Sequence, residues 1–529
     1  MLKAYKSDVL LCLADLSNDE VFTPPAIANS MLDLLPQEIW GNPNIKILDP
    51  AAKSGVFLRE AAKRMLNAQV PDFQKNLDEM EERKKEGKAL TQKQLQFQEK
   101  LQDTINHIFR HQLFALPITE LTALLTRRSV YCSKDAMNEH SVVQGFDDRQ
   151  GNMRFFADIA HEWENGKCKS CGASAKTLDR EDGKEQHAYA FIHYKQLVKK
   201  WSEIKEMHFD VIIGNPPYQL SDGGGTGSSA MPIYHLFVEQ AKKLNPDYLV
   251  MITPSRWFAG GKGLDNFRDE MLNDKRISTI VDYINSNDVF PGVDISGGIS
   301  YFLWNKNHNG DCIVRSMEHK EVLSELKRPL KEKNADTFIR YNEAISILRK
   351  VQQFEENSFS VLVSSRKPFG LDTNVFGEEK PDTENNIIFY TSKGIQYIGR
   401  KKIKQNQDAI DKYKVYISKA YGERISSNFW VIGKPFLGEP NTACTETYLL
   451  IGTFADKQTC ENVMSYIKTR FFRFLVLLKK NTQNTAKGTY QFVPQQDFSK
   501  SWTDKELYQK YGLDNEEIAF IEKMVREME

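Results

Sequence analysis

Short apolar runs alternate with helical patterns over roughly the first 305 residues. Apolar strands are expected at residues 45–50, 209–214, 247–254 and 297–304, and residues 54–66 repeat apolar positions at helical spacing. Strands separated by helices are typical of an α/β fold, with a mostly parallel sheet covered by helices on both faces. Such sheets bind ligands beyond the carboxyl ends of their strands.

Two segments interrupt this alternation. Residues 69–102 are rich in Lys, Glu and Gln with few apolar positions, which predicts a solvated helical arm. Residues 131–193 hold three of the seven cysteines and several histidines, which indicates an insertion. We therefore expect a first domain at residues 1–320 that carries both segments.

The alternation fades after residue 320, and residues 321–529 are expected to form a second, mixed α+β domain. Two helix-start patterns, at residues 503–506 and 514–517, have the capping-box spacing. Apolar residues then recur at helical spacing, so we expect the last helix to pack on the body of this domain. They are Ile518, Ile521 and Val525.

The composition excludes several classes of protein. The chain has 529 residues, 40% of them hydrophobic, which is enough to build large cores and excludes a disordered chain. No apolar run approaches the roughly 20 residues that span a bilayer, and the first 20 residues lack a cleavage pattern, so neither a membrane protein nor a secreted one is expected. Seven cysteines in so long a chain indicate a reducing, cytoplasmic setting.

Charge is balanced, with 71 basic and 71 acidic residues. A chain without net positive charge cannot attract nucleic acid over its whole surface. Any nucleic-acid partner must therefore be held by a local basic cleft.

Residues 210–218 carry the most informative pattern, a buried strand that runs into Gly-Asn-Pro-Pro-Tyr. Pro216 and Pro217 restrict φ and cannot donate backbone hydrogen bonds, so the loop is stiff. The side-chain oxygen of Asn215 and the backbone oxygen of Pro216 could hold both hydrogens of an exocyclic amino group.

Those two acceptors would solve a chemical problem. The lone pair of an aromatic amine is delocalised into its ring, and acceptors on both N–H bonds favour a tetrahedral nitrogen that can reach a methyl donor. Tyr218 offers a stacking face for a planar base. A tight Pro-Pro turn capped by Asn215, without chemical function, is the alternative.

A second motif lies at residues 47–64, where a strand ends at Asp49 and a helix begins near Ser54 and Gly55. Small residues let a ligand approach the backbone, and a helix N-terminus favours anionic groups such as a carboxylate. A third motif, Phe22-Thr23-Pro24, precedes an amphipathic helix.

With these motifs in order, the chain resembles the γ-class DNA N6-adenine methyltransferases of bacterial restriction–modification systems. The resemblance covers roughly residues 19–305 and implies a Rossmann-like domain dependent on S-adenosyl-L-methionine, followed by a target-recognition domain. It implies catalysis by Asn215, Pro216, Pro217 and Tyr218, with Phe290 as a second aromatic against an extruded base. The cofactor residues it implies are Phe22, Thr23, Pro24, Asp49, Pro50, Ala51, Ser54, Gly55 and Asn215.

The chain departs from the family at two positions. Lys53 replaces a glycine, so the backbone there should avoid positive φ. Lys53 is left either as a contact to the cofactor carboxylate or DNA, or as a solvated lysine. The acidic residue that grips the cofactor ribose should end the second strand, and Glu120 is the nearest candidate.

The insertion holds a Cys-x-x-Cys half-site of the kind that binds zinc. The predicted ligands of a structural Zn²⁺ are Cys132, His161, Cys168 and Cys171, with His187 as a substitute. A pair of reduced surface thiols is the alternative, and a redox role is disfavoured because no thioredoxin-like pattern surrounds the pair.

DNA contacts are expected at two places. The glycine-rich residues 221–232 are suited to order over an extruded adenine, or are simply a surface loop. Basic clusters at residues 399–404, 413–424 and 479–491 combine phosphate-neutralising and base-reading residues, although each alone also suits a solvated surface.

The sequence thus predicts methyl transfer to N6 of adenine in double-stranded DNA, with the base flipped out of the helix. The alternatives are an RNA or protein N-methyltransferase and a non-catalytic zinc-containing DNA-binding protein. A motif that begins at Phe22 leaves no room for an N-terminal nuclease, and residues 380–386 lack a nuclease partner motif. Any restriction endonuclease is therefore expected to be a separate chain.

Overall fold

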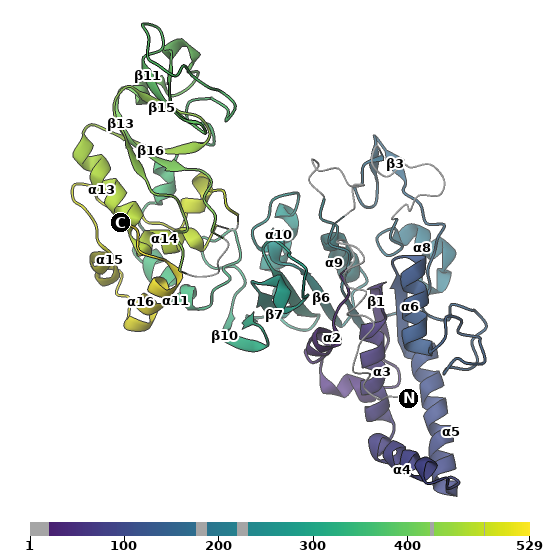
Figure 1. Ribbon diagram of the computed structural model, residues 1–529. Coiled ribbons are helices and arrows are strands. Elements are labelled where there is room, and N and C mark those ends of the chain that lie inside the picture. The colour runs from purple at the N-terminus through teal and green to yellow at the C-terminus, as the bar shows by residue number, and fades with distance from the viewer. Residues whose placement is uncertain (1–20, 176–187, 220–230, 424–427, 481) are drawn as a thin grey trace. The chain divides into compact units, whose positions relative to one another are not determined.

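The computed structural model describes residues 21–175, 188–219, 231–423, 428–480 and 482–529 (Figure 1). The chain forms two compact units, one extending to Lys331 and the other from Glu332 to Glu529. No described helix is both long and apolar enough to cross a membrane.

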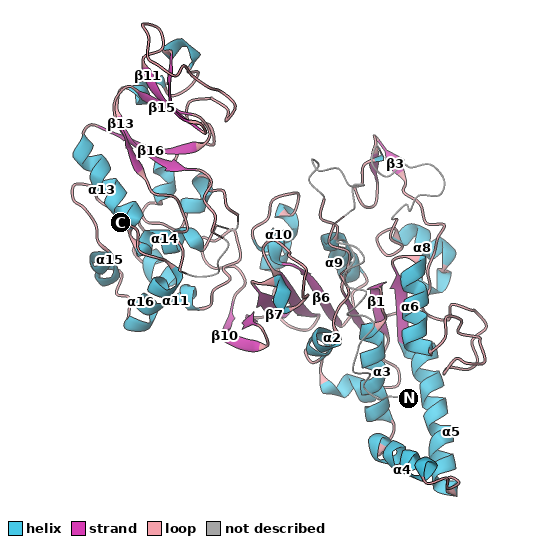
Figure 2. Cartoon of the chain, in the orientation of Figure 1, coloured by secondary structure: helices cyan, strands magenta, loops and turns pink. Residues whose placement is uncertain are grey.

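The first unit combines one large sheet with helices and a small hairpin (Figure 2). Its strands are β1 (Ile47–Ala52), β2 (Leu113–Pro117), β3 (Trp163–Glu164), β4 (Lys167–Cys168), β5 (Val211–Gly214), β6 (Tyr248–Pro254), β7 (Ile277–Tyr283), β8 (Ile299–Asn305), β9 (Cys312–Glu318) and β10 (Glu321–Arg328). Its helices are α2 (Pro25–Leu32), α3 (Val56–Gln69), α4 (Phe73–Lys85), α5 (Gln92–His107), α6 (Glu120–Tyr131), α8 (Tyr194–Lys200), α9 (Tyr234–Lys243) and α10 (Asp265–Asn273).

The large sheet has the strand order β10-β9-β7-β8-β6-β5-β1-β2. Pairing of β2 with β1, β1 with β5, β5 with β6 and β7 with β9 is parallel, and β8 is antiparallel to both neighbours. Within the described residues, β8 and β10 alone run against the other strands of this sheet. The predicted α/β fold with a mostly parallel, Rossmann-like sheet is confirmed.

Alternate residues of each central strand face opposite layers of helices. On β6, Val250 and Ile252 belong to the core cluster that also contains Met31 of α2 and Phe57 of α3. The intervening Met251 is fully buried outside that cluster, and α9 packs on the same strand. Burial on both faces explains why these strands read as continuous apolar runs.

The order of the strands creates one special place at the carboxyl edge. From β1 the chain moves outward to β2, and it then returns to place β5 on the other side of β1. Ligands of open α/β sheets bind where the strand order reverses in this way. The loops that follow β1 and β5 are the two sequence motifs described above, so the fold brings them together.

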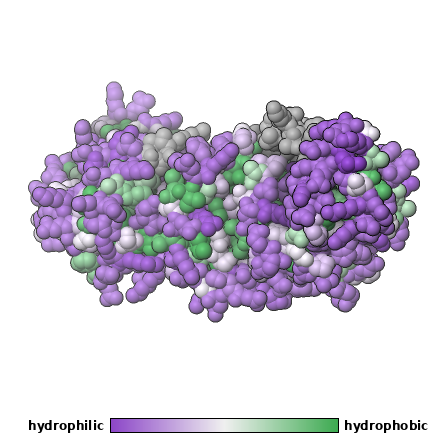
Figure 3. All heavy atoms as spheres, turned by 90° about the horizontal axis from the view of Figure 1, so that it is seen from below, coloured by the Kyte–Doolittle hydropathy of each residue, from purple (hydrophilic) through white to green (hydrophobic). Residues whose placement is uncertain are grey.

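The charge-rich stretch forms the helical arm that its composition predicted. α4 and α5 are exposed over most of their length, and Phe73 and Phe97 are their buried apolar anchors. α5 begins with a capping box between Thr91 and Gln94. Hydrophilic residues, purple in Figure 3, cover most of the molecular face drawn there.

The second unit holds two three-stranded sheets and a group of helices. Its strands are β11 (Ile387–Thr391), β12 (Gly394–Ile398), β13 (Tyr413–Ser418), β14 (Phe436–Gly438), β15 (Thr442–Cys444) and β16 (Tyr448–Phe454). Its helices are α11 (Glu343–Gln352), α12 (Gln407–Ile410), α13 (Lys457–Lys468), α14 (Arg470–Leu477), α15 (Asp504–Lys510) and α16 (Asn515–Met524). The predicted α+β character is confirmed.

Several local predictions hold in this unit. Both capping boxes form, with Thr503 at the start of α15 and Asp514 at the start of α16. Ile521 and Val525 are fully buried, and α16 packs against α11 and α14. The last helix is therefore packed on the body of its own unit, as its spacing indicated.

Candidate functional site

The Asn-Pro-Pro-Tyr loop leaves the sheet beside β1. Gly214 is the last residue of β5, and a Cβ atom built on it would lie 3.0 Å from Asp49 Oδ1 and 3.3 Å from Pro50 Cδ. Any larger residue would press on Asp49 and Pro50 and force them to shift by a few tenths of an ångström. The glycine therefore holds the two motifs against each other.

Asn215 is held in one orientation. Its side chain is 3% exposed, and Nδ2 donates to Val21 O at 3.0 Å and to Thr23 Oγ1 at 3.1 Å. Because a backbone carbonyl can only accept, the nitrogen must face Val21. Asn215 Oδ1 is buried and has no hydrogen-bond partner among the described residues. A buried, oriented acceptor without a partner is costly unless a ligand supplies the donor.

Val21 O is the point where the three motifs meet. Besides Asn215, the ammonium of Lys53 donates to this carbonyl at 3.0 Å. Lys53 is 6% exposed and its φ is not positive, as predicted for a residue in place of glycine. The solvated lysine that the sequence left open is wrong, because the ammonium is buried against Val21, which lies next to the third motif.

Asp49 is a buried carboxylic acid at the same edge. It is 2% exposed, and its Oδ1 accepts a hydrogen bond from the Ala51 N–H at 3.1 Å. Burial raises the pKa of Asp49 to about 7, although the Ala51 hydrogen bond and the charge of Lys53 act in the opposite direction. The acid can thus take up or release a proton near neutral pH.

The loop after β1 leads directly into α3. β1 extends to Ala52, three residues past the expected end at Asp49, and α3 begins at Val56 after Gly55, whose φ is +72°. A Cβ on Gly55 would meet α6 at Val130 Cγ2 and Thr126 Cα, 3.1 and 3.2 Å away. Ser54 is buried, so small residues do line this turn.

Tyr218 closes the loop on its other side. Its carbonyl accepts from Ile233 N at 3.1 Å, and Gln219 forms a bridge with Pro232. These contacts join the described ends of the glycine-rich stretch, of which residues 221–230 lie outside the described part. The Tyr218 ring is partly buried against the core, and burial raises the pKa of its hydroxyl well above the ordinary value.

The remaining predicted residues of this site lie beside Asn215, at the start of a helix or in the core. Thr23 is buried beside Asn215, and Pro24 caps α2. Glu120 is the exposed first residue of α6, just past the carboxyl end of β2. Phe290 is 2% exposed and lies inside the main core cluster. A ring so deeply buried has no open face, which argues against the expected base-stacking role of Phe290.

The insertion brings together four metal-binding side chains, one of which differs from the prediction. His161, Cys168, Cys171 and His193 are all buried, and their ligand atoms lie within 4.8 Å of one another. Cys132 was the wrong choice, because it is exposed at the C-terminal end of α6 and is not part of this group. His187 lies outside the described residues.

Sequence reasoning also missed two contributors, Val21 and His193. Val21 acts through its backbone carbonyl, which no side-chain pattern reveals. His193 could have been found by preferring ligands within one compact segment, since it is nearer to Cys171 in the sequence than Cys132 is.

The basic clusters of the second unit divide into buried and exposed lysines. Lys414 is fully buried, its ammonium donates to three backbone carbonyls, and burial lowers its pKa to about 8. Burial likewise lowers the pKa of Lys480 to about 8. Lys401 and Lys402 are exposed. The cluster at residues 399–404 is therefore the better candidate for phosphate contacts.

The chain is similar in sequence to known methylases. The family model described as Eco57I restriction-modification methylase matches residues 111–290. An uncharacterized adenine-specific methylase of Mycoplasma pneumoniae is 34% identical over 343 residues, which cover 59% of this chain and 74% of the relative.

Solved restriction–modification enzymes are more distant. A nuclease-deletion mutant of the type ISP enzyme LlaGI, solved with a DNA substrate mimic, is 11% identical over 90% of this chain, with a TM-score of 0.46. The type IIL enzyme MmeI, solved with DNA, is 13% identical over 92% of this chain, with a TM-score of 0.43. This chain spans 46% and 64% of those two solved chains.

Proposed function

Since the chain belongs to the adenine-specific methylases of restriction–modification systems, we propose that it methylates N6 of adenine in double-stranded DNA, with S-adenosyl-L-methionine as methyl donor. The observation that carries this proposal is Asn215 Oδ1, a buried acceptor whose amide nitrogen is already occupied by Val21 and Thr23. An exocyclic amino group is a donor that suits it.

The corner formed by Asn215 and Pro216 acts on the substrate nitrogen through fixed dipoles. Asn215 Oδ1 and the Pro216 carbonyl would each accept one amino hydrogen of the adenine. The two hydrogen bonds pull the nitrogen toward tetrahedral geometry and stabilise the positive charge that develops there. Because Asn215 is anchored to Val21, little reorganisation is needed when the base arrives.

The base must leave the DNA helix to reach this corner, at a cost of a few kcal/mol. Tyr218, next to the corner and partly exposed, would offset this cost by stacking on the extruded ring. The buried Phe290 would support the core beneath and make no contact with the base.

The loop after β1 fits the methyl donor, which supplies an electrophilic methyl group on a sulfonium. Asp49, Pro50, Ala51, Ser54 and Gly55 would line its site, and the small residues leave the backbone accessible. The N-terminus of α3 would attract the carboxylate of the donor. Phe22 and Glu120 would contact its remaining parts, with Glu120 accepting from the ribose hydroxyls.

The second unit would read the DNA sequence. Its exposed lysines at residues 399–404 would neutralise phosphates, which positions a duplex without specifying its bases. A separate restriction endonuclease that cuts unmethylated copies of the same sequence would be the functional counterpart.

Expression in a methylation-deficient host, followed by sequencing that detects modified adenines, tests the proposal. We expect N6-methyladenine within one recurring sequence. Purified protein should transfer labelled methyl to duplex DNA containing that sequence and not to RNA or protein. Transfer to RNA or protein alone would replace the substrate, and failure to bind S-adenosyl-L-methionine would favour a non-catalytic DNA-binding protein.

A further inference from the structure

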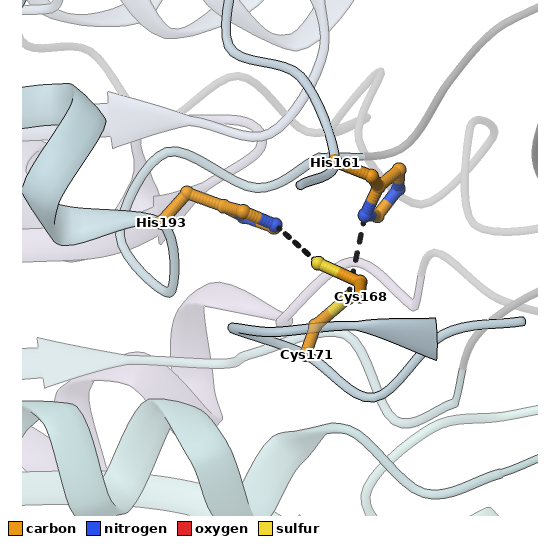
Figure 4. A group of neighbouring side chains, drawn as sticks. All are labelled: His161, Cys168, Cys171 and His193. Atoms are coloured by element: carbon orange, nitrogen blue, oxygen red, sulfur yellow. Dashed lines mark hydrogen bonds between the residues drawn. The ribbon is translucent and has the colours of Figure 1, made fainter. Parts of the chain in front are cut away.

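The four buried side chains of the insertion come from three separate pieces of chain. His161 precedes β3, Cys168 ends β4, Cys171 lies in the following turn, and His193 directly precedes α8. Figure 4 shows both imidazoles pointing at the sulfur atoms, with His193 Nε2 3.4 Å from Cys168 Sγ and His161 Nδ1 3.4 Å from Cys171 Sγ.

These separations match the edges of a metal-centred tetrahedron. With Zn–S near 2.3 Å and Zn–N near 2.0–2.1 Å, tetrahedral angles place sulfur and nitrogen about 3.5 Å apart. All four ligand atoms lie within 4.8 Å of one another, so one ion can reach them after small shifts. The donor set of two thiols and two imidazoles is one that zinc prefers.

A second layer of hydrogen bonds already orients the ligands. His193 Nδ1 lies 2.9 Å from the Tyr189 carbonyl, so this nitrogen carries the hydrogen and Nε2 presents its lone pair toward Cys168. The turn between the cysteines is also fixed, because Cys168 N donates to Ala173 O and Gly172 N donates to Cys168 O. Gly172 adopts a φ of +71°, which a glycine accommodates without strain.

The backbone that carries this group is a short hairpin, extended by one further bridge between Lys167 and Ser174. β3 and β4 form a two-stranded hairpin around Asn165 and Gly166, both with positive φ, as in a tight two-residue turn. So small a sheet is marginal in water by itself. A metal ion that joins the hairpin to His161 and His193 would supply the missing stability.

We propose that His161 Nδ1, Cys168 Sγ, Cys171 Sγ and His193 Nε2 bind one Zn²⁺ as a closed structural site. Each of the four residues is less than a tenth exposed, which leaves no open position for water or substrate. The site is therefore not a catalytic centre.

The position of the group gives the ion a mechanical role. A Cβ on Gly172 would lie 3.6 Å from Met231 Cε, and Met231 precedes Pro232, which pairs with Gln219 after the catalytic loop. Tyr189 and Phe191 pack on Phe237 of α9. The ion thus fixes the insertion against the segment to which the Asn-Pro-Pro-Tyr loop returns.

Metal analysis of the purified full-length chain tests the site without DNA or methyl donor, so its outcome is independent of the proposed function. We expect about one zinc per chain in the wild type and in Cys132→Ser, the matched control. Cys168→Ser and His193→Gln should lose at least nine tenths of that zinc. Loss in Cys132→Ser with retention in His193→Gln would overturn the ligand set.

Cobalt substitution of the wild type gives a reading that does not depend on folding of a variant. Tetrahedral Co²⁺ with two thiolates should show intense visible bands and thiolate charge transfer, and zinc should abolish both. Absence of zinc in the purified protein, together with absence of this spectrum on Co²⁺ addition, would overturn the proposal. The group would then be two thiols hydrogen-bonded to two histidines.

Discussion

The first unit contains two groups of buried polar side chains that are built in opposite ways. At the carboxyl edge of the sheet, Asn215 and Lys53 donate to the Val21 backbone carbonyl, and Asp49 accepts from the Ala51 N–H. In the insertion, Cys168 and His193 face each other, as do Cys171 and His161. The side chains of the first group bond mainly to backbone atoms, whereas those of the second also face one another in pairs.

The difference explains what each group can receive. A corner fixed by strands keeps its shape whether or not a guest is present, which suits the proposed uptake and release of substrate in every turnover. In the insertion, two thiols and two imidazoles already face one another, and an ion that joined all four would be a permanent guest. Hydrogen bonds to the backbone therefore suit exchange of a guest in the first group, and metal ligation suits a permanent guest in the second.

The largest effect on methyl transfer is expected from loss of Asn215 Oδ1, the acceptor without a partner in the corner formed by Asn215 and Pro216. Asn215→Ala should lower methyl transfer roughly a thousandfold, as loss of a preorganised polar group at a reacting centre commonly does. Binding of S-adenosyl-L-methionine and zinc content should remain within twofold of wild type, as measured by calorimetry and metal analysis. Wild-type turnover in this variant would refute the assigned role of Asn215.

The sequence did predict the strand and the tight loop that carry the corner. Prolines, glycines and a buried strand are local features, and their meaning does not depend on distant residues. The capping boxes at Thr503 and Asp514 were recognisable for the same reason. Strand–helix alternation similarly yielded the α/β fold.

Prediction failed where a residue's role depends on the returning chain. His193 reaches Cys168 only because the chain folds back before α8, whereas Cys132 was chosen for its chemistry alone. Phe290 was assigned from motif order, but the core cluster encloses its ring. Lys53 has its role through a carbonyl 32 positions away in the sequence. Neighbouring residues in the sequence do not reveal any of these contacts.

The second largest effect concerns pH and stability of the donor-free protein. The pKa of Asp49 is about 7 in the folded chain and near 4 when unfolded, so the folded state binds more protons between those values. Stability should therefore fall as pH rises from about 4 to 7, by up to about 4 kcal/mol. Asp49→Asn removes this dependence.

Thermal or urea unfolding of wild type and Asp49→Asn across this range measures the difference directly. The Asn variant should match the wild type near pH 4 and exceed it increasingly up to about pH 8. Other titrating groups are common to both proteins and cancel. A constant difference at all pH values would show that Asp49 titrates normally.

A smaller effect on methyl transfer is expected from Tyr218, whose ring would stack on the base. Tyr218→Ala should reduce kcat/KM about tenfold to a hundredfold, because stacking of one base contributes about 1–3 kcal/mol. Tyr218→Phe should retain most activity, since the ring supplies the contact. If the Phe variant were as impaired as the Ala variant, the hydroxyl would be the essential group.

The smallest effect on methyl transfer is expected from loss of the hydrogen bond between Lys53 and the Val21 carbonyl. Lys53→Met removes one of two donors to Val21 O and should slow transfer roughly fivefold, as expected for about 1 kcal/mol. It should also raise the pKa of Asp49 further, because the positive charge of Lys53 now lowers it. Unfolding measurements with and without Asp49→Asn would show that upward shift.

Lys93→Met on the exposed face of α5 is the matched control and should change neither quantity. An unshifted Asp49 in Lys53→Met would mean that the ammonium serves the Val21 carbonyl alone. Lys53 would then hold the loop in place without changing the pKa of Asp49.

Adjacent placement of β1 and β5 has a further consequence. Neighbouring strands lie about 4.8 Å apart, so the loops that follow β1 and β5 start from points one strand spacing apart. In the proposed reaction, these loops would hold the methyl donor and the amine, and backbone pairing that no side chain can stretch would set the spacing between them. Diversification toward new target sequences would have to occur in the loops and the second unit, while that gap stays constant.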